Sequence, residues 1–153
     1  MRTAAGDALT STVLPAFELN GEFLAAAEDI TAPAGLTPAW WQVLGATLNE
    51  ALPVAEIARR VGLGLARQSV QRTADILVEK GWAEYVENPK HRRAKLLQPT
   101  DAGRKTVHEL RDEQHAWANA VGREVGEDEI RRVQEGMRKI IAASRRYRAT
   151  NDS

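Results

Sequence analysis

The chain has 153 residues, of which 43% are hydrophobic and 27% charged, so its composition is that of one folded domain of ordinary size. It contains no cysteine, which excludes disulfides, thiolate metal ligands and cysteine nucleophiles. No run of 18 apolar residues occurs, and no apolar stretch follows a basic start. We therefore expect a cytoplasmic protein that makes no contact with a membrane.

The net charge of zero is distributed unevenly along the chain. Residues 1–53 contain one basic and six acidic side chains, whereas residues 54–105 contain eleven basic and six acidic ones. Residues 106–153 contain nine of each. A basic middle segment favours a central site for a polyanion, and ordinary fluctuation of charge along a chain is the alternative explanation.

The N-terminal third predicts two helices. The first is expected from about Asp7 to Ala27, because apolar residues recur there near the helical period, and Pro15 is expected to bend it or delay its start. Thr37 and Pro38 then have the pattern of an N-cap followed by a first helical residue, which begins a helix that is expected to run to about Glu50.

The centre of the chain predicts two helices followed by a hairpin. Helices are expected over residues 54–61 and 66–80, and strands over residues 82–86 and 95–98. Gly62 and Gly64 break the chain between the helices, and Gly81 ends the second one. The strands are joined by a basic, turn-forming stretch from Asn88 to Arg93, so the hairpin has a charged tip.

The C-terminal third predicts a long helix capped by Thr100, an interruption from Gly122 to Gly126, and a last helix with an apolar seam. The seam consists of Ile130, Val133, Met137, Ile140, Ser144 and Tyr147. Too little chain is left to cover this seam, so we expect both terminal regions to interdigitate with those of a second copy in a two-fold dimer. An intramolecular bundle of the first and the last two helices is the alternative.

Hydrogen-bonding side chains crowd the leading turns of the helix over residues 66–80. Arginine, glutamine and serine are side chains that distinguish bases in the major groove, and basic hairpin tips contact the backbone or the minor groove. The candidate DNA-contacting residues are Arg67, Gln68, Ser69, Gln71 and Arg72 on the helix, and Lys90, Arg92, Arg93 and Lys95 on the hairpin. Arg59, Arg60 and Lys95 are expected to contact phosphates. A solvated polar face without a partner is the alternative.

Five segments in order resemble the multiple antibiotic resistance regulator (MarR) family of bacterial transcription factors. They are Leu36–Leu44, Val54–Gly62, Ala66–Arg72, Leu77–Trp82, and Arg92–Leu96 with Thr100–Arg104. The resemblance implies a mainly α winged helix-turn-helix homodimer that binds a pseudo-palindromic operator in double-stranded DNA. It also implies a repressor, and many members release DNA when a small aromatic or phenolic molecule enters a pocket. In these terms residues 1–35 and 101–153 are dimerisation helices, and residues 36–100 are the DNA-binding domain.

By the same resemblance the helix near Ala66 is the recognition helix, and Arg93 matches the arginine of the wing. The chain departs from the family pattern at three places. His91 stands where an aspartate usually helps to hold the wing, so the wing is expected to be held differently or to be more mobile. Residues 62–65 make a longer connection than usual, and Pro99 stands where a leucine usually ends the second wing strand.

The candidate ligand-binding residues are Phe17, Trp40 and Val43, with dimer packing as an equal alternative for Trp40. No cofactor or metal is expected, because His108 and His115 lie seven residues apart on one helix and two ligands do not complete a zinc site. No histidine has a neighbouring nucleophile, so we expect no enzyme. The alternatives to a ligand-responsive regulator are a winged-helix module that binds proteins and a DNA-binding regulator without an effector.

Overall fold

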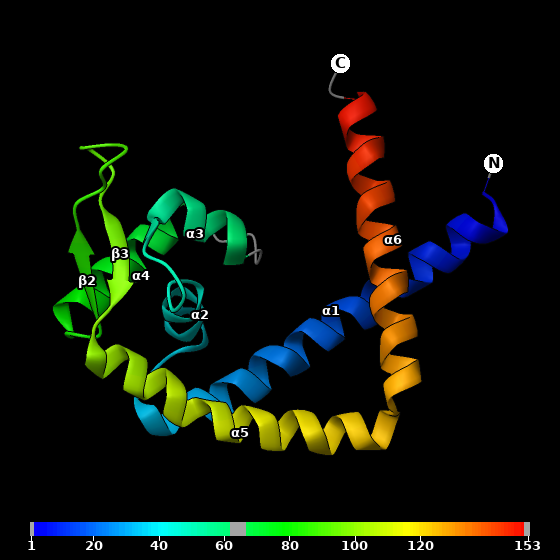
Figure 1. Ribbon diagram of the computed structural model, residues 1–153. Helices are drawn as coiled ribbons and strands as arrows, with labels where there is room; N and C mark the ends of the chain where they lie inside the picture. The colour runs from blue at the N-terminus through cyan, green and yellow to red at the C-terminus, as the bar shows by residue number, and fades with distance from the viewer. Residues whose placement is uncertain (1, 62–66, 152–153) are drawn as a thin grey trace. The chain divides into compact units, whose positions relative to one another are not determined.

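The computed structural model describes residues 2–61 and 67–151, which divide into two compact units, Met1–Glu113 and Gln114–Ser153 (Figure 1). The helices are α1 (Ala4–Thr31), the short 3₁₀ turn η1 (Ala32–Ala34), α2 (Pro38–Ala46), α3 (Val54–Val61), α4 (Arg67–Glu79), α5 (Asp101–Val125) and α6 (Glu127–Asn151), and the strands are β1 (Leu52–Pro53), β2 (Ala83–Val86) and β3 (Leu96–Pro99). The predicted class, mainly helical with a winged helix-turn-helix, is confirmed. In the ranges described, no helix has the length and apolarity needed to span a bilayer.

Helix α1 is longer than predicted. It begins at Ala4, where the hydroxyl of Thr3 accepts a hydrogen bond from the Gly6 N–H, and it continues through Pro15 to Thr31. Pro15 therefore does not delay the start of the helix. The chain leaves α1 through η1 and turns at Gly35, whose φ of 72° is the left-handed conformation that glycine adopts without strain.

Helix α2 begins as predicted and ends early. The hydroxyl of Thr37 accepts a hydrogen bond from the Trp40 N–H at 3.2 Å, which confirms the N-cap. The helix ends at Ala46 rather than Glu50, because the buried Thr47 hydroxyl donates to the Leu44 carbonyl at 2.9 Å and satisfies part of the last turn. Helix α3 has the predicted bounds, whereas residues 62–66, including the predicted glycine break and Ala66, lie outside the described residues.

The sheet has three antiparallel strands in the order β1-β3-β2. Strands β2 and β3 each begin one residue later than predicted, and β1 was not predicted, because its two residues are too few to show an alternating pattern. Pro99 ends the central strand opposite Ala83. Strand β1 pairs only with Leu96 and Leu97, so no strand on that side requires an N–H from Pro99.

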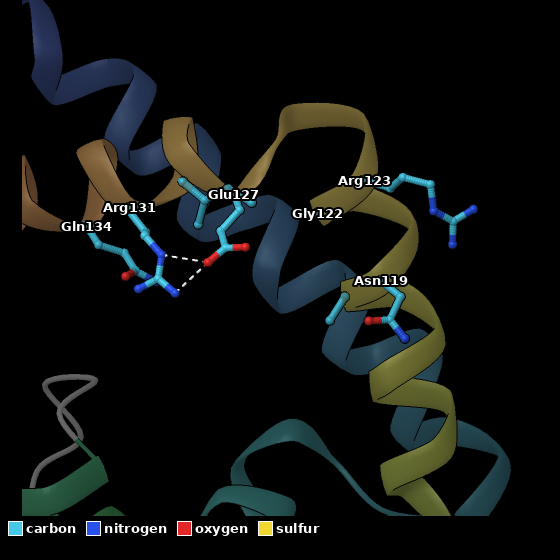
Figure 2. A pocket seen from close by; sticks show the side chains of 8 residues that line it. Asn119, Gly122, Arg123, Glu127, Arg131 and Gln134 are labelled. Carbon is cyan, nitrogen blue, oxygen red and sulfur yellow. Dashed lines mark hydrogen bonds and ion pairs between the residues drawn. The ribbon is translucent and has the colours of Figure 1, made fainter.

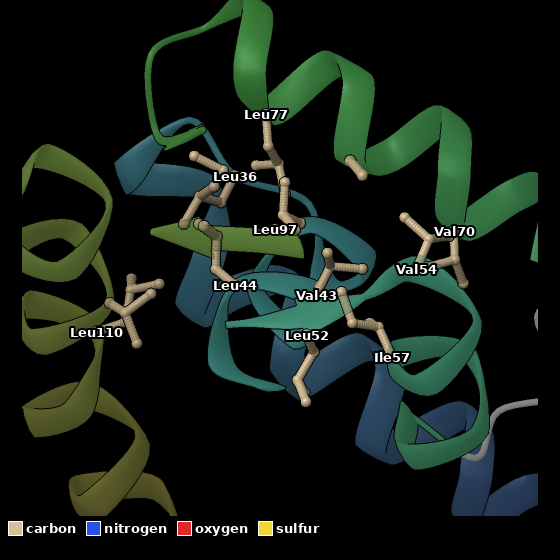
Figure 3. Packing of buried hydrophobic residues seen from close by; sticks show 13 residues of the cluster. Leu36, Val43, Leu44, Leu52, Val54, Ile57, Val70, Leu77, Leu97 and Leu110 are labelled. Carbon is tan, nitrogen blue, oxygen red and sulfur yellow. The ribbon is translucent and has the colours of Figure 1, made fainter. Parts of the chain in front are cut away.

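The core of the first unit lies between α2, α3, α4 and the sheet (Figure 3). Its buried apolar residues are Leu36, Val43, Leu44, Leu52, Val54, Ile57, Val70, Ala74, Leu77, Ala83, Leu97, Val107 and Leu110. On α4 the buried positions Val70, Ala74 and Leu77 follow the helical period, so α4 presents its other face to solvent. This packing positions the candidate interface.

The start of α5 is hydrogen-bonded to, and packs against, the turn that follows α4. Thr100 caps α5 by accepting from the Gly103 N–H, and its hydroxyl donates to the Gly81 carbonyl at 2.7 Å. Gly103 packs so closely that a Cβ atom there would lie 2.0 Å from the carbonyl oxygen of Trp82. Only glycine fits this contact. The predicted interruption from Gly122 is wrong, because α5 continues to Val125 and the chain turns at Gly126 alone, with a φ of 92°.

Candidate nucleic-acid interface

The solvent face of α4 carries the predicted base-reading side chains. Arg67, Gln68, Gln71 and Arg72 are exposed, and Ser69 is half-buried beside the core residue Val70. The helix therefore brings the predicted set together on one surface, because its apolar residues occupy the opposite side. Arginine, glutamine and serine on such a surface have the donors and acceptors that match base edges in a major groove.

Gln71 differs from its neighbours because its amide is already hydrogen-bonded within the protein. Its Nε2 donates to Asp75 Oδ1 at 3.0 Å and to the Tyr85 hydroxyl at 2.9 Å. The Tyr85 hydroxyl in turn donates to Asp75 Oδ1 at 2.5 Å. These three residues, the α4–β2 cluster, join the exposed face of α4 to strand β2 of the hairpin.

Burial raises the pKa of Tyr85 well above its usual range, and the hydrogen bond to Asp75 raises it further. The hydroxyl therefore keeps its proton and its donor role at neutral pH. Sequence reasoning missed both Asp75 and Tyr85. The spacing of Gln71 and Asp75, four residues apart on one helix, indicates a local hydrogen bond, whereas nothing in the sequence pairs either of them with Tyr85.

The wing is the loop between β2 and β3, which extends beyond the ends of both strands (Figure 1). All four predicted wing residues, Lys90, Arg92, Arg93 and Lys95, are exposed. Asn88 organises the turn, since its side-chain oxygen accepts from the Lys90 N–H at 3.0 Å and its carbonyl accepts from the His91 N–H at 3.2 Å. The turn is therefore held by Asn88, in a chain where His91 replaces the usual aspartate.

The expected phosphate contacts on α3 are engaged with carboxylates. Arg59 and Arg60 both pair with Glu56, and Arg60 Nη1 also lies 2.8 Å from Glu50 Oε1. The hydrogen bond that Arg60 donates to Glu50, followed by the one it donates to Glu56, raises the pKa of Arg60. A phosphate would have to compete with these carboxylates for Arg59 and Arg60, so the wing holds the less compensated positive charge.

The three predicted ligand-binding residues lie in different environments. Val43 is fully buried in the core, whereas Phe17 is 69% exposed on α1. Trp40 is half-buried, with its ring centroid 6.1 Å from that of Trp82 and 5.4 Å from the Lys80 ammonium. These contacts account for Trp40 as a packing residue at the edge of the core, and they engage its ring without a ligand.

A cleft of about 600 Å³ occurs elsewhere, within residues 114–153 at the turn from α5 to α6 (Figure 2). Its lining consists of Ala118, Asn119, Gly122, Arg123, Glu127, Ile130, Arg131 and Gln134. Glu127 and Arg131 form an ion pair across one turn of α6, at 2.5 Å. No aromatic side chain of the described residues lines this cleft, so it has little in common with the predicted aromatic site. The described residues also contain no group of three or more metal-ligating side chains.

A family model and a curated relative match this chain. A family model described as the MarR family matches residues 34–94, which include α2, α3, α4, β2 and the wing loop as far as Ala94. An uncharacterized protein of Mycobacterium tuberculosis is 34% identical over 137 residues, covering 90% of this chain and 94% of that protein.

Two solved structures have the same fold. A mutant of MarR from E. coli complexed with operator DNA matches with a TM-score of 0.76 and 18% identity, covering 91% of this chain and 99% of that one. CouR from Rhodococcus jostii RHA1, bound to p-coumaroyl-CoA, matches with a TM-score of 0.69 and 21% identity, covering 80% and 86%. The helices and strands described above therefore have the arrangement found in proteins of this kind.

Proposed function

The chain belongs to the MarR family of transcription regulators, and on that premise we propose that it binds an operator in double-stranded DNA specifically, as a homodimer, and acts as a repressor. The observation that carries the proposal is the exposed polar face of α4 beside a wing with four exposed basic residues. A major groove accepts one helix, and basic side chains beside it neutralise phosphates. The operator-bound structure of E. coli MarR supports the same use of this fold.

Large apolar side chains at both ends of the chain support the homodimer. Leu9, Val13, Leu14 and Phe17 are exposed on α1, and Val133, Met137, Ile140 and Tyr147 are exposed on α6. A soluble monomer rarely exposes so many apolar residues along whole helices, so a second copy is the proposed cover. Two recognition helices about one turn of DNA apart would then meet a pseudo-palindromic site.

Selection of sites from a random pool of DNA duplexes tests operator binding. We expect a pseudo-palindrome, with affinity that falls steeply as salt rises, because wing and helix cations displace counterions from phosphates. A protein-binding module would instead bind selected and random duplexes equally. A promoter reporter carrying the selected site then tests the repressor role, which predicts lower output with the protein than without it.

Two substitutions assign roles within this interface. Gln68→Ala is expected to relax base preference at one position by about 1–3 kcal/mol, because a base-reading amide is lost. Arg93→Ala is expected to weaken all sequences similarly and to reduce the salt slope by about one, because a phosphate contact is lost. Quantitative gel shifts on the selected site and on single-base variants distinguish the two. An equal loss on every sequence for Gln68→Ala would contradict its base-reading role.

Relief by a small aromatic molecule is the third part of the proposal, and the CouR complex with p-coumaroyl-CoA supports it by analogy. A ligand weakens DNA binding only to the extent that it prefers a state with another spacing of the recognition helices. Titration of phenolic compounds against tryptophan fluorescence tests this, with Trp40→Phe as the variant and Trp117→Phe as the control. A regulator without an effector would show no saturable quenching and no release of DNA.

A further inference from the structure

The α4–β2 cluster of Gln71, Asp75 and Tyr85 has only one consistent set of hydrogen-bond directions. A carboxylate oxygen only accepts, so the two groups within 3.0 Å of Asp75 Oδ1 must both donate to it. The Tyr85 hydroxyl uses its single proton in this way, and its oxygen accepts from Gln71 Nε2. The nitrogen of the Gln71 amide therefore faces the cluster, and its oxygen faces away.

This arrangement determines which hydrogen-bond donor and acceptor of Gln71 remain available to a partner. The two acceptors of the Nε2 group lie only 2.5 Å from each other, so one N–H can serve both in a three-centre bond. Gln71 then keeps Oε1 as an acceptor and its second N–H as a donor, in an orientation fixed before any partner arrives. A free glutamine on the same helix could rotate its amide by half a turn and exchange donor for acceptor.

We propose that Tyr85 and Asp75 are positioning residues that hold Gln71 as a preset reader of a base with an exocyclic amino group, adenine before cytosine. In the major groove adenine offers an N6 donor and an N7 acceptor, which match Oε1 and the remaining N–H. Cytosine offers only the N4 donor, and guanine and thymine present oxygen acceptors that oppose Oε1. The inference rests on the proposed function, because it names what this part of the recognition surface selects.

The location of the cluster favours a role in recognition over one in stability. Gln71 and Asp75 are exposed, and hydrogen bonds between exposed side chains contribute little to folding. Tyr85 comes from β2, so the hairpin that carries the wing also orients a residue of the recognition helix. Base preference and wing position are therefore linked through one hydroxyl group.

The test measures base preference at each operator position, for the wild type and three variants, by selection from a random pool followed by gel shifts on single-base variants. Gln71→Ala identifies the position that Gln71 reads. Tyr85→Phe keeps the ring and the net charge, and Asp75→Ala removes the common acceptor. At the position identified, we expect the wild type to prefer adenine over guanine and thymine about tenfold, and both other variants to reduce this preference to about twofold or less.

Two control variants separate positioning from charge and from general damage. Glu79→Ala removes a carboxylate one turn further along α4. Like Asp75→Ala, it is expected to raise affinity for all sequences, because one negative charge is lost. Unlike Asp75→Ala, it is expected to leave base preference unchanged. Gln98→Ala removes another side-chain hydrogen bond of the same hairpin, from Gln98 Nε2 to Glu84 Oε1 at 2.7 Å, and is expected to leave base preference unchanged. Discrimination between bases, rather than affinity, is the readout that a purely structural role would leave unchanged.

The outcomes are distinguishable. If the wild type selects no site, the proposed function fails. If it selects a site and Gln71→Ala changes no position, or if Tyr85→Phe and Asp75→Ala both keep the wild-type preference there, the proposed function stands and the positioning inference is overturned. A preference for guanine or thymine at that position would overturn it as well, since it would require the reversed amide.

Discussion

The winged-helix part of this chain buries its apolar residues, whereas the terminal helices expose theirs. Within the described residues, every buried apolar side chain lies between Leu36 and Leu110. In the part of the chain that the structure describes, every large apolar residue that is strongly exposed lies on α1 or in residues 117–147. The winged-helix part thus has a core of its own, whereas the terminal helices expose apolar residues along their length.

The difference indicates which contacts determine the structure of each part. The winged-helix part buries its apolar residues against elements that are near in sequence, so its structure is complete within one copy. The terminal helices carry apolar residues at a regular helical period on exposed faces, which is the pattern expected of the proposed interface between copies. The first part is therefore expected to respond to core substitutions, and the second to changes in association.

The largest effect is expected for Leu77→Ala in the core. Leu77 is fully buried on α4, and truncation of such a residue removes apolar contact and leaves a cavity. We expect the free energy of unfolding to fall by about 2–5 kcal/mol. Urea denaturation at fixed protein concentration measures it, with the exposed Glu79→Ala as the control, which should change stability by less than about 0.5 kcal/mol. A loss below about 1 kcal/mol for Leu77→Ala would mean that the core is loosely packed.

The next effect is expected for Ile140→Asp on the apolar seam of α6. Ile140 is 42% exposed, so a carboxylate there should leave the fold intact and oppose association. We expect the dissociation constant of the dimer to rise about 30-fold or more, which corresponds to a loss of about 2 kcal/mol. Sedimentation over a concentration series measures it. Ala142→Asp, two residues further and on another side of the helix, is the matched control. A monomeric wild type would contradict the interpretation of the terminal helices.

A smaller effect on stability is expected for Gly103→Ala at the joint between the wing sheet and α5. The added Cβ would overlap the Trp82 carbonyl, so the backbone must shift, which costs about 1–3 kcal/mol of unfolding free energy. Gly45→Ala on α2 is the control, because nothing lies within 4 Å of its added Cβ, and alanine there should be neutral or stabilising by up to about 1 kcal/mol. Equal effects of the two substitutions would show that the close contact is relieved in solution.

The smallest effect is a pH dependence confined to the winged-helix part. The pKa of Tyr85 is raised by burial and by Asp75, so the folded state holds this proton more tightly than the unfolded state does. Its contribution to stability is therefore complete below about pH 10, the ordinary pKa of tyrosine, and is lost as pH rises above that value. In Tyr147→Phe, where Tyr85 is the only tyrosine left, absorbance of tyrosinate should appear above pH 10. In the double variant with Asp75→Ala it should appear at lower pH, and an unchanged titration would exclude the contribution of Asp75.

Much of the fold could be predicted because its signals are local. Thr37 and Thr100 were recognised as N-caps, and α3 has the bounds that its apolar spacing indicates. The errors occur where tertiary contacts decide. Strand β1 is two residues long and exists only through its pairing with β3, and α2 ends where the buried Thr47 satisfies its carbonyls.

The exposure of the candidate side chains on α4 and on the wing was predicted from equally local signals. Residue type and helical spacing identified the side chains that α4 exposes, but not that Gln71 is already engaged. Arg59 and Arg60 were grouped with the phosphate contacts by charge alone, although Glu56 lies within one turn of both. Charge and spacing identify candidate residues, whereas their availability depends on neighbours that come from other elements.

The sequence by itself determined the order of helices, the two caps, the basic hairpin and the polar face of α4, because each depends on residues within a few positions of one another. Only the tertiary structure decided that Tyr85, from a strand ten residues beyond Asp75, orients Gln71, and that Trp82 leaves room for glycine alone at position 103. Such contacts join residues whose spacing in the sequence does not follow the repeat of a helix or a strand. They follow from the packing of α4 and α5 against the sheet.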